Sequence, residues 1–482
     1  MRSRLVNIAT WRTLLVGRGT FWKKIVARKF VQNVGVLTTA NTVVAALNFV
    51  QGILIARWLG PELYGVVALV MNYPNLILGF FDARSVTASV KYLGEYHALG
   101  EHDRALAMCK LGYAVDLAVA CLTFLVLVLT AHFAARSIAQ DPAVASLMVL
   151  YGAALIPRAL VGTSDAILAT LGYFPFIARI EIVSTVFRTV LIIGLALAGW
   201  QVAGVIWANA LAAIATGLLY GGFAWVVVRR TWGGSIFRAS FKTLKGRRRE
   251  IFSFLAYNDV GALVGMIPRQ LDTLLLGYFR NPTEVGYYKL AKSLSNVTGY
   301  LIGPLKAVAY PELARLWGLG QKGDFSRKVR MLATCIALPL GGIILLGSGF
   351  VSLALPLLVG EIYLPAVRAT QLLFIGSAIS ISLFWVRLIY LVRGDVRQLL
   401  IVNSSVTLGF ALIYPFIIRE WGYMGASGWM LALYVVGYGA SGICLWQRTK
   451  NEKYVDLVQR NNQSLTPHKT AGHLSASVQE QS

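Results

Sequence analysis

The stretch Ile53-Leu-Ile-Ala-Arg-Trp-Leu-Gly-Pro-Glu-Leu-Tyr-Gly65 has a diverged second copy 221 residues further along the chain. At this one offset Leu54, Pro61, Gly65 and Leu69 fall on Leu275, Pro282, Gly286 and Leu290. The same offset places Trp200, Gly204, Gly221 and Trp225 on Trp421, Gly425, Gly442 and Trp446. Matches near the start and the end of each half indicate that the chain consists of two copies of one unit.

Composition places both copies in a membrane. The chain is 57% hydrophobic and 14% charged, with a mean hydropathy of +0.64. A bilayer core needs about 20 apolar residues per crossing helix, and it offers the backbone no other hydrogen bonds. Apolar segments of this kind lie near residues 34–56, 64–83, 107–130, 145–170, 176–199 and 202–228, and near 251–277, 285–308, 328–350, 366–391, 397–418 and 424–446.

Six segments in each half give both halves the same orientation in the bilayer. The sequence therefore predicts an all-α, polytopic membrane protein of about twelve helices, arranged as two parallel six-helix lobes. Parallel repeats are typical of transporters whose binding site lies between the halves and opens to each side in turn. We expect such a site here.

The formal net charge of +24 is distributed in a way that predicts topology. Residues 1–33 contain eight cations and no acid, and residues 229–249 contain eight more cations. With twelve crossings both stretches and the C-terminal tail share one side, which the positive-inside rule assigns to the cytoplasm. Contact with anionic membrane lipids explains the remaining basic character, so nucleic-acid binding is not expected.

Five segments are expected along the chain, and their boundaries follow the hydrophobic and basic stretches. They are a basic, interfacial N-terminal arm (1–33), a first lobe (34–230), a basic cytoplasmic linker (231–250), a second lobe (251–447) and a disordered cytoplasmic tail (448–482). The arm repeats apolar residues at helical spacing among its cations, as in helices that lie on a membrane surface. The tail is polar in composition.

Polar residues recur on one face of four corresponding spans, the first, second, seventh and eighth. They are Asn41, Asn48 and Gln51; Asn72, Asn75, Gly79 and Asp82; Asn258, Gly265, Arg269 and Asp272; and Lys289, Lys292, Ser293, Asn296 and Tyr300. A charge at mid-bilayer costs about 2.5–3.5 kcal/mol on insertion scales, so several together must face one another or a wet cavity. These four helices are therefore predicted to line a polar cavity between the lobes.

Several of these cations have more than one interpretation. Arg269 and Asp272 are three residues apart and could pair with each other, and Lys289 and Lys292 could extend toward headgroups. Arg158 and Arg188, in the fourth and fifth spans, could bind a ligand or be neutralised by nearby acids (Asp116, Asp165 and Glu181). Arg84 is either an interface anchor or part of a cytoplasmic vestibule.

No pattern indicates an enzyme or a cofactor. The four cysteines lie singly in apolar segments, a spacing that suits neither zinc nor a disulfide framework. The five histidines form no plausible catalytic cluster, and no Walker-type phosphate loop is present. A membrane glycosyl ligase or polymerase would need a large outer loop with catalytic groups, and the outer loops are short.

The stretch 53–65 resembles the first-helix signature of the polysaccharide-biosynthesis oligosaccharide flippases, in the multidrug/oligosaccharidyl-lipid/polysaccharide exporter superfamily. Asp272-Thr-Leu-Leu-Leu-Gly-Tyr-Phe-Arg-Asn-Pro-Thr-Glu-Val-Gly-Tyr-Tyr288 resembles the matching signature of the second half, and Tyr310-Pro-Glu-Leu-Ala-Arg315 continues it. With the repeat, the resemblance covers residues 30–447. It implies a multidrug-exporter-like fold, and it carries over no residue, because the family lacks a fixed catalytic motif.

The resemblance further implies a flippase that moves an undecaprenyl-diphosphate-linked oligosaccharide across the bacterial inner membrane. The product would serve cell-surface polysaccharide synthesis, such as exopolysaccharide or lipopolysaccharide, together with polymerase machinery. Expected substrate-binding residues are Arg269, Lys289, Lys292, Asn296, Asn48, Asn75, Arg84 and Arg158, and candidates for ion coupling are Asp272 and Asp259. The main alternative is a drug or cation antiporter of the same superfamily, which would need acids in the cavity.

Overall fold

The computed structural model describes residues 8–81, 85–247, 249–251, 253 and 270–464, and no β-strand occurs among them. The first half contains α1 (Ile8–Phe81), α2 (Ser85–Ala98), α3 (His102–Ser137), α4 (Ala145–Arg158), α5 (Leu160–Thr170), α6 (Phe174–Leu197) and α7 (Gln201–Trp232). The second half contains α9 (Asp272–Phe279), α10 (Pro282–Gly318), α11 (Lys322–Met331), α12 (Leu338–Val359), α13 (Ala366–Ser382), α14 (Phe384–Arg393) and α15 (Val396–Ser464). The all-α prediction is confirmed.

Two of the longest helices are helical hairpins. Gly60 lies inside α1 at φ 72°, and Gly422 lies inside α15 at φ 53°, both in the left-handed region that favours glycine. Eight stretches of the described chain are long and apolar enough to cross a membrane, and two of them contain these turns. These eight stretches give ten crossings. In addition, α10 lies at the eighth predicted span and α9 at the end of the seventh, whose residues 254–269 lie outside the described residues. The chain is a multi-pass membrane protein.

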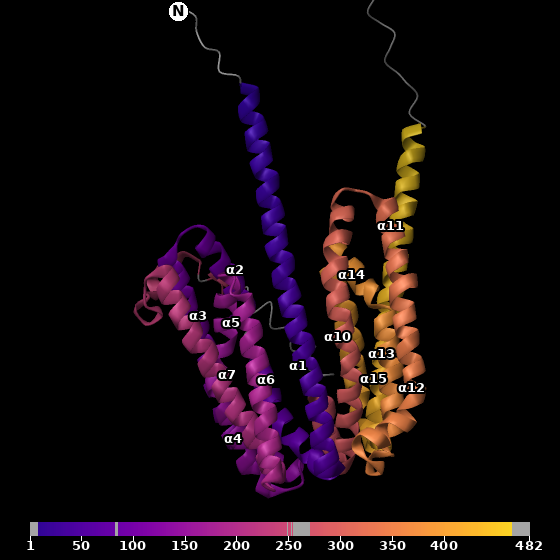
Figure 1. Cartoon of the computed structure of the whole chain (residues 1–482). Coiled ribbons are helices and arrows are strands. Elements are labelled where there is room, and N and C mark those ends of the chain that lie inside the picture. The colour runs from indigo at the N-terminus through magenta and orange to yellow at the C-terminus, as the bar shows by residue number, and fades with distance from the viewer. Residues whose placement is uncertain (1–7, 82–84, 248, 252, 254–269, 465–482) are drawn as a thin grey trace, which may run out of the picture.

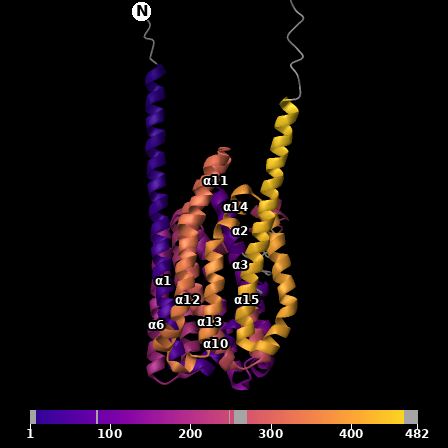
Figure 2. The ribbon, with the colours of Figure 1, turned by 90° about the vertical axis from the view of Figure 1, so that its right-hand side faces the viewer.

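The helices form two groups, which Figure 1 shows side by side. We call α1 to α7 the N-lobe and α9 to α15 the C-lobe; each packs mainly within itself, and α1 against α10 is the main contact between them. The groups approach each other at the end that holds the Gly60 and Gly422 turns, which we call the turn end. They diverge toward the opposite end, from which α1 and α15 project (Figures 1 and 2).

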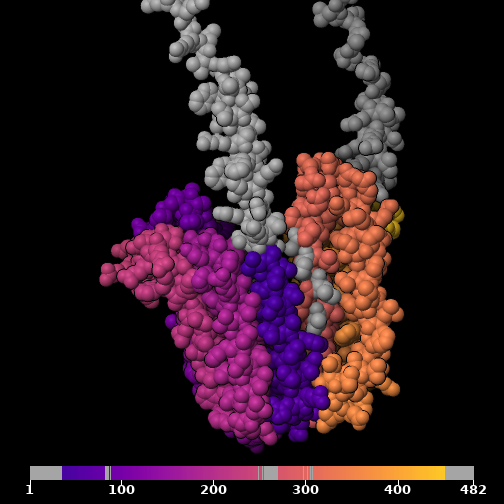
Figure 3. All heavy atoms as spheres, in the orientation of Figure 1, coloured from indigo at the N-terminus to yellow at the C-terminus, as the bar shows by residue number. Residues whose placement is uncertain are grey.

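The buried apolar residues follow the same division. At the turn end one continuous core includes residues of both lobes, among them Leu69 and Leu274, and the Tyr363 hydroxyl donates to the Ala56 carbonyl at 2.9 Å. Toward the other end each lobe has its own core, around Tyr92 in the N-lobe and Phe325 in the C-lobe. Among the described residues the lobes therefore share a core at the turn end and have separate cores toward the other end, and the space-filling view shows two masses that meet along α1 (Figure 3).

Two terminal segments differ from their predictions. Residues 8–33, expected as a separate interfacial helix, continue α1 without a break and project beyond the bundle. No proline interrupts the chain between residues 8 and 60, so the helix of the first span extends through the arm. Residues 448–464, expected to be disordered, continue α15 as helix, and the rest of the tail lies outside the described residues.

Candidate functional site

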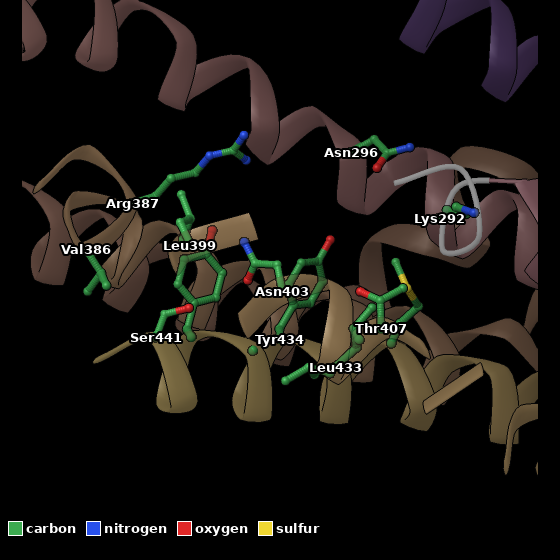
Figure 4. A pocket seen from close by; sticks show the side chains of 14 residues that line it. Lys292, Asn296, Val386, Arg387, Leu399, Asn403, Thr407, Leu433, Tyr434 and Ser441 are labelled. Carbon is green, nitrogen blue, oxygen red and sulfur yellow. The ribbon is translucent and has the colours of Figure 1, made fainter. Parts of the chain in front are cut away.

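A cavity of about 620 Å³ lies within the C-lobe, between α10, α14 and both arms of α15. Its polar lining residues are Lys292, Asn296, Arg387, Asn403, Thr407, Tyr434, Tyr438 and Ser441. Figure 4 shows Lys292 and Asn296 on α10, with Asn403, Thr407 and Tyr434 on the facing wall. The cavity thus offers two cations with amides, hydroxyls and aromatic rings inside a membrane-spanning lobe.

Helical spacing explains how these side chains reach one cavity. Asn403 and Thr407 are four residues apart on the first arm of α15, so they lie on one face of it. Tyr434, Tyr438 and Ser441 follow the same rule on the second arm. The turn at Gly422 makes the two arms antiparallel, and their polar faces therefore meet at the same depth opposite α10.

Lys292 connects this cavity to a buried carboxylate. Its Nζ lies 2.5 Å from Asp272 Oδ2, and the Asp272 side chain is 0% exposed while that of Lys292 is 15% exposed. The Tyr288 hydroxyl donates to the same Oδ2 at 2.6 Å, and Thr273 donates its amide and its hydroxyl to Oδ1 at 2.6 and 3.1 Å. Four donors therefore hold Asp272, and only Lys292 among them also faces the cavity.

The other cations of this region have no such carboxylate partner among the described residues. Lys289 is half-buried one turn before Lys292, and no hydrogen bond or ion pair joins it to any described residue. Arg387 is exposed to the cavity, and Lys306 lies close enough to be repelled by its charge. Against four cations the described residues around the cavity supply one carboxylate, Asp272. The excess of positive charge in and around the cavity therefore favours binding of an anion.

The candidates of the N-lobe are mostly engaged within that lobe. The Asn48 side-chain oxygen accepts a hydrogen bond from Arg188, and Gln51 donates to Thr189 Oγ1 at 3.3 Å. Asn75 donates to the Met71 carbonyl at 2.7 Å and to the Tyr151 hydroxyl at 3.3 Å. These amides therefore tie helices of one lobe together, as structural polar residues do in membranes.

The predicted neutralisation of the N-lobe arginines is not found among the described residues. Arg158 is exposed, and no described carboxylate lies within ion-pair distance of Arg158 or Arg188. The acids considered for this role have other partners: Glu181 accepts from the Tyr220 hydroxyl at 3.0 Å, and Asp116 accepts from Thr163 Oγ1 at 2.7 Å. Arg158 thus stays available to a ligand.

Three predicted site residues, Arg84, Asp259 and Arg269, lie outside the described residues. The sequence interpretation missed Arg387, Asn403, Thr407, Tyr434 and Ser441. Two signals could have found them: an arginine inside the apolar tenth span, and i, i+4 and i+7 polar spacings in the last two spans.

Comparison with protein families gives one match along more than half of the chain. Residues 30–317 match the model described as "Polysaccharide biosynthesis protein". A search of curated proteins found no match.

Solved structures of similar fold cover most of the chain. An inward-facing multidrug resistance MATE family transporter of the MOP superfamily is 17% identical with a TM-score of 0.63, covering 84% of this chain and 93% of its own. The lipid II flippase MurJ in an inward closed conformation is 14% identical with a TM-score of 0.64, covering 85% and 87%. A mutant of the Vibrio cholerae MATE transporter VcmN is 14% identical with a TM-score of 0.59, covering 89% and 98%. The prediction of two parallel six-helix lobes in an exporter-like fold is confirmed.

Proposed function

The chain belongs to the polysaccharide biosynthesis protein family, and from this membership we propose that it is a flippase for a lipid-diphosphate-linked oligosaccharide. The similar fold of a lipid II flippase supports a lipid-linked substrate. The translocated product would pass to polymerase machinery that builds a cell-surface polysaccharide. No bond of the substrate would be made or broken, so the protein acts as a transporter and not as an enzyme.

The observation that carries this proposal is the charge of the C-lobe cavity. Lys292 and Arg387 line it, and Lys289 and Lys306 lie nearby, whereas the described residues place one carboxylate, that of Asp272, beside them. A diphosphate presents several acceptor oxygens and negative charge, with which ammonium and guanidinium groups form strong charge-assisted hydrogen bonds. Asn296, Asn403 and Thr407 supply the amides and hydroxyls that sugars require.

Residues beyond the cavity complete the proposed substrate path. Arg158 is exposed on the N-lobe, and Asn48 and Asn75 lie on α1 of the same lobe. We assign Arg158, with Arg84 and Arg269, to contacts along the path between the lobes, and Asn48 and Asn75 to holding the helices beside that path in place. Asp272 and Asp259 are assigned to ion coupling.

The joined turn end suggests how the cycle starts. The lobes share a core there and diverge toward the end from which α1 and α15 project. The positive-inside rule assigns the latter end to the cytoplasm of a bacterial inner membrane. The conformation then corresponds to a loading state, and closing of the lobes at the cytoplasmic end would expose the substrate to the outer side.

A drug or cation antiporter fits the cavity less well. A cationic substrate requires an accessible carboxylate, and Asp272 is fully buried and bonded to Lys292. The flippase proposal is tested by depleting the protein in cells that make the polymer. Lipid-diphosphate-linked oligosaccharide should accumulate, and wild-type protein should relieve the accumulation while a variant with Lys292→Met and Arg387→Met should not. Unchanged levels of this intermediate on depletion would contradict the proposal.

A further inference from the structure

The ion pair between Lys292 and Asp272 connects a completely buried side chain to one that lines the cavity. Asp272 belongs to α9 and is completely buried, whereas Lys292 belongs to α10 and lines the cavity. The pair therefore connects the seventh span to the wall of the proposed substrate site. A pair that only stabilised the fold would have no need of a cavity-facing partner.

Asp272 keeps several hydrogen-bond donors when Lys292 leaves. Three further donors contact its carboxylate, namely the Tyr288 hydroxyl and the amide and hydroxyl of Thr273. A buried charge that loses its only partner is strongly unfavourable, but hydrogen bonds to its remaining lone pairs reduce that penalty. Lys292 can thus leave Asp272 at a smaller cost than in an isolated buried pair.

An anion bound in the cavity would be a favourable alternative partner for Lys292, whose side chain lines the cavity. An anion in the cavity can approach Nζ without entering the buried environment of Asp272. A diphosphate carries more charge than a carboxylate, so its attraction for the ammonium group is stronger at equal distance. The neighbouring cations Lys289 and Arg387 add to the attraction that holds the anion beside Lys292.

We propose that Asp272 is a positioning residue that holds Lys292 until an anionic ligand in the cavity takes its place as the partner of Lys292, so that occupancy of the cavity breaks the ion pair between α9 and α10 and leaves the hydrogen bond from Tyr288 to Asp272. This inference rests on the proposed function, because it takes the ligand to be a diphosphate. α9 also packs against α1 and α15. Release of Lys292 would therefore weaken the packing of the seventh span where the two lobes meet. In this way the charge of the substrate would affect the movement of the lobes.

The test measures binding of inorganic pyrophosphate to the purified full-length chain in detergent, by isothermal titration calorimetry at fixed pH and ionic strength. Asp272→Asn removes the competing charge and should tighten binding roughly threefold or more, whereas Lys292→Met should weaken it about tenfold. The double variant should bind no more tightly than Lys292→Met alone. A gain in affinity is informative because damage to the fold would lower it.

Two further variants provide an independent test and a control. Tyr288→Phe removes one donor from Asp272, which should hold Lys292 more firmly and weaken pyrophosphate binding. Asp395→Asn is the matched control. The substitution breaks the 2.8 Å ion pair with Arg448 in the same lobe, and Asp395 is not among the residues that line the cavity. Its affinity should equal that of the wild type.

The outcomes separate the two proposals. If Lys292→Met binds pyrophosphate as well as the wild type, the cavity is not an anion site and the proposed function loses its main support. A second outcome is that Lys292→Met weakens binding, Asp272→Asn fails to tighten it, and Tyr288→Phe has no effect. The cavity then binds anions, but the proposal that the anion replaces Asp272 as the partner of Lys292 is wrong. Should Asp272→Asn fail to fold, Tyr288→Phe alone decides.

Discussion

Gly65 and Gly286 occupy the same position in the two halves, and each lies against the other half's helix start. A Cβ on Gly65 would come within 1.8 Å of the Pro282 carbonyl oxygen, and a Cβ on Gly286 within 1.8 Å of the Pro61 carbonyl oxygen. The second arm of α1 and α10 thus cross backbone to backbone at the turn end. The reciprocal contact marks the pseudo-twofold relation between the lobes, and any side chain there would separate them.

The crossing predicts that Gly65→Ala and Gly286→Ala destabilise the protein. Each added methyl group meets a carbonyl oxygen that belongs to a helix backbone and cannot move alone, so overpacking should cost about 1–3 kcal/mol. Thermal unfolding of the purified chain in detergent measures the loss. Gly299→Ala on α10 is the control, because a Cβ there meets nothing within 4 Å. Equal unfolding temperatures for Gly286→Ala and Gly299→Ala would refute a tight crossing.

The repeat predicted that both halves share a fold, but it did not predict this contact. Residues near a twofold axis meet their own counterparts, and here the backbone of each proline, Pro61 and Pro282, faces the glycine of the opposite half. Sequence periodicity locates a helix and its polar face. It does not locate the axis between two bundles, because that depends on packing between segments far apart in the chain.

Topology gives the second prediction. Reporter fusions after residues 20, 240 and 455 should all report the cytoplasm, and a fusion near residue 138 should report the outer side. The physical reason is the placement of cations at one end of the helices. A cytoplasmic signal at 138 would overturn the helix count and the assignment of a loading state.

Charge in the cavity gives the third prediction. If the cations bind diphosphate, replacing Arg269, Lys289 and Lys292 together by Ala should reduce polymer export strongly while membrane abundance stays normal. Each charge-assisted hydrogen bond lost is worth about 1.5–3 kcal/mol, or roughly tenfold or more in affinity. Arg387→Ala should act in the same direction, because Arg387 lines the same cavity. Normal export from the triple variant would exclude these residues from the site.

The linker between the lobes gives the fourth prediction. Arg247 binds Glu95 at 2.5 Å and Glu250 at 2.9 Å, and its guanidinium lies over the rings of Tyr92 and Tyr96. Arg247→Ala should release the linker from α2, so trypsin should cleave after Lys242 or Lys245 faster than in the wild type. Arg249→Ala removes an exposed arginine of the same linker and should leave the cleavage rate unchanged.

Protonation of Glu250 should weaken the same linker contact. The hydrogen bond from Arg247 holds the pKa of the Glu250 carboxyl below its usual value. A lowered folded-state pKa means that the pair stabilises the linker above the ordinary glutamate pKa and is lost as the pH falls through the lowered one. Glu250→Gln imitates the protonated state, so at neutral pH it should accelerate tryptic cleavage as Arg247→Ala does. An unchanged rate would contradict this role.

The candidate site was only partly predictable, and its particular residues show why. Lys292 and Asn296 lie on a polar stripe of one helix, which spacing alone reveals. The sequence offered Arg269, which lies outside the described residues, as a neighbour of Asp272, and it gave no sign that Lys292 reaches Asp272 from another helix. Arg387, Asn403 and Thr407 lie in two different apolar spans, and the rotation of each helix in the bundle, which the spacing within one span does not reveal, brings them into one cavity.

The most direct test of the account is translocation by the purified protein in proteoliposomes that contain a fluorescently labelled, lipid-diphosphate-linked oligosaccharide. A quencher added outside reports how much label has crossed to the outer leaflet. The account predicts protein-dependent translocation that falls about tenfold or more in a variant with Lys292→Met and Arg387→Met, each position losing a charged hydrogen bond. Translocation at the rate of protein-free vesicles, or an equal rate in this variant and the wild type, would contradict it.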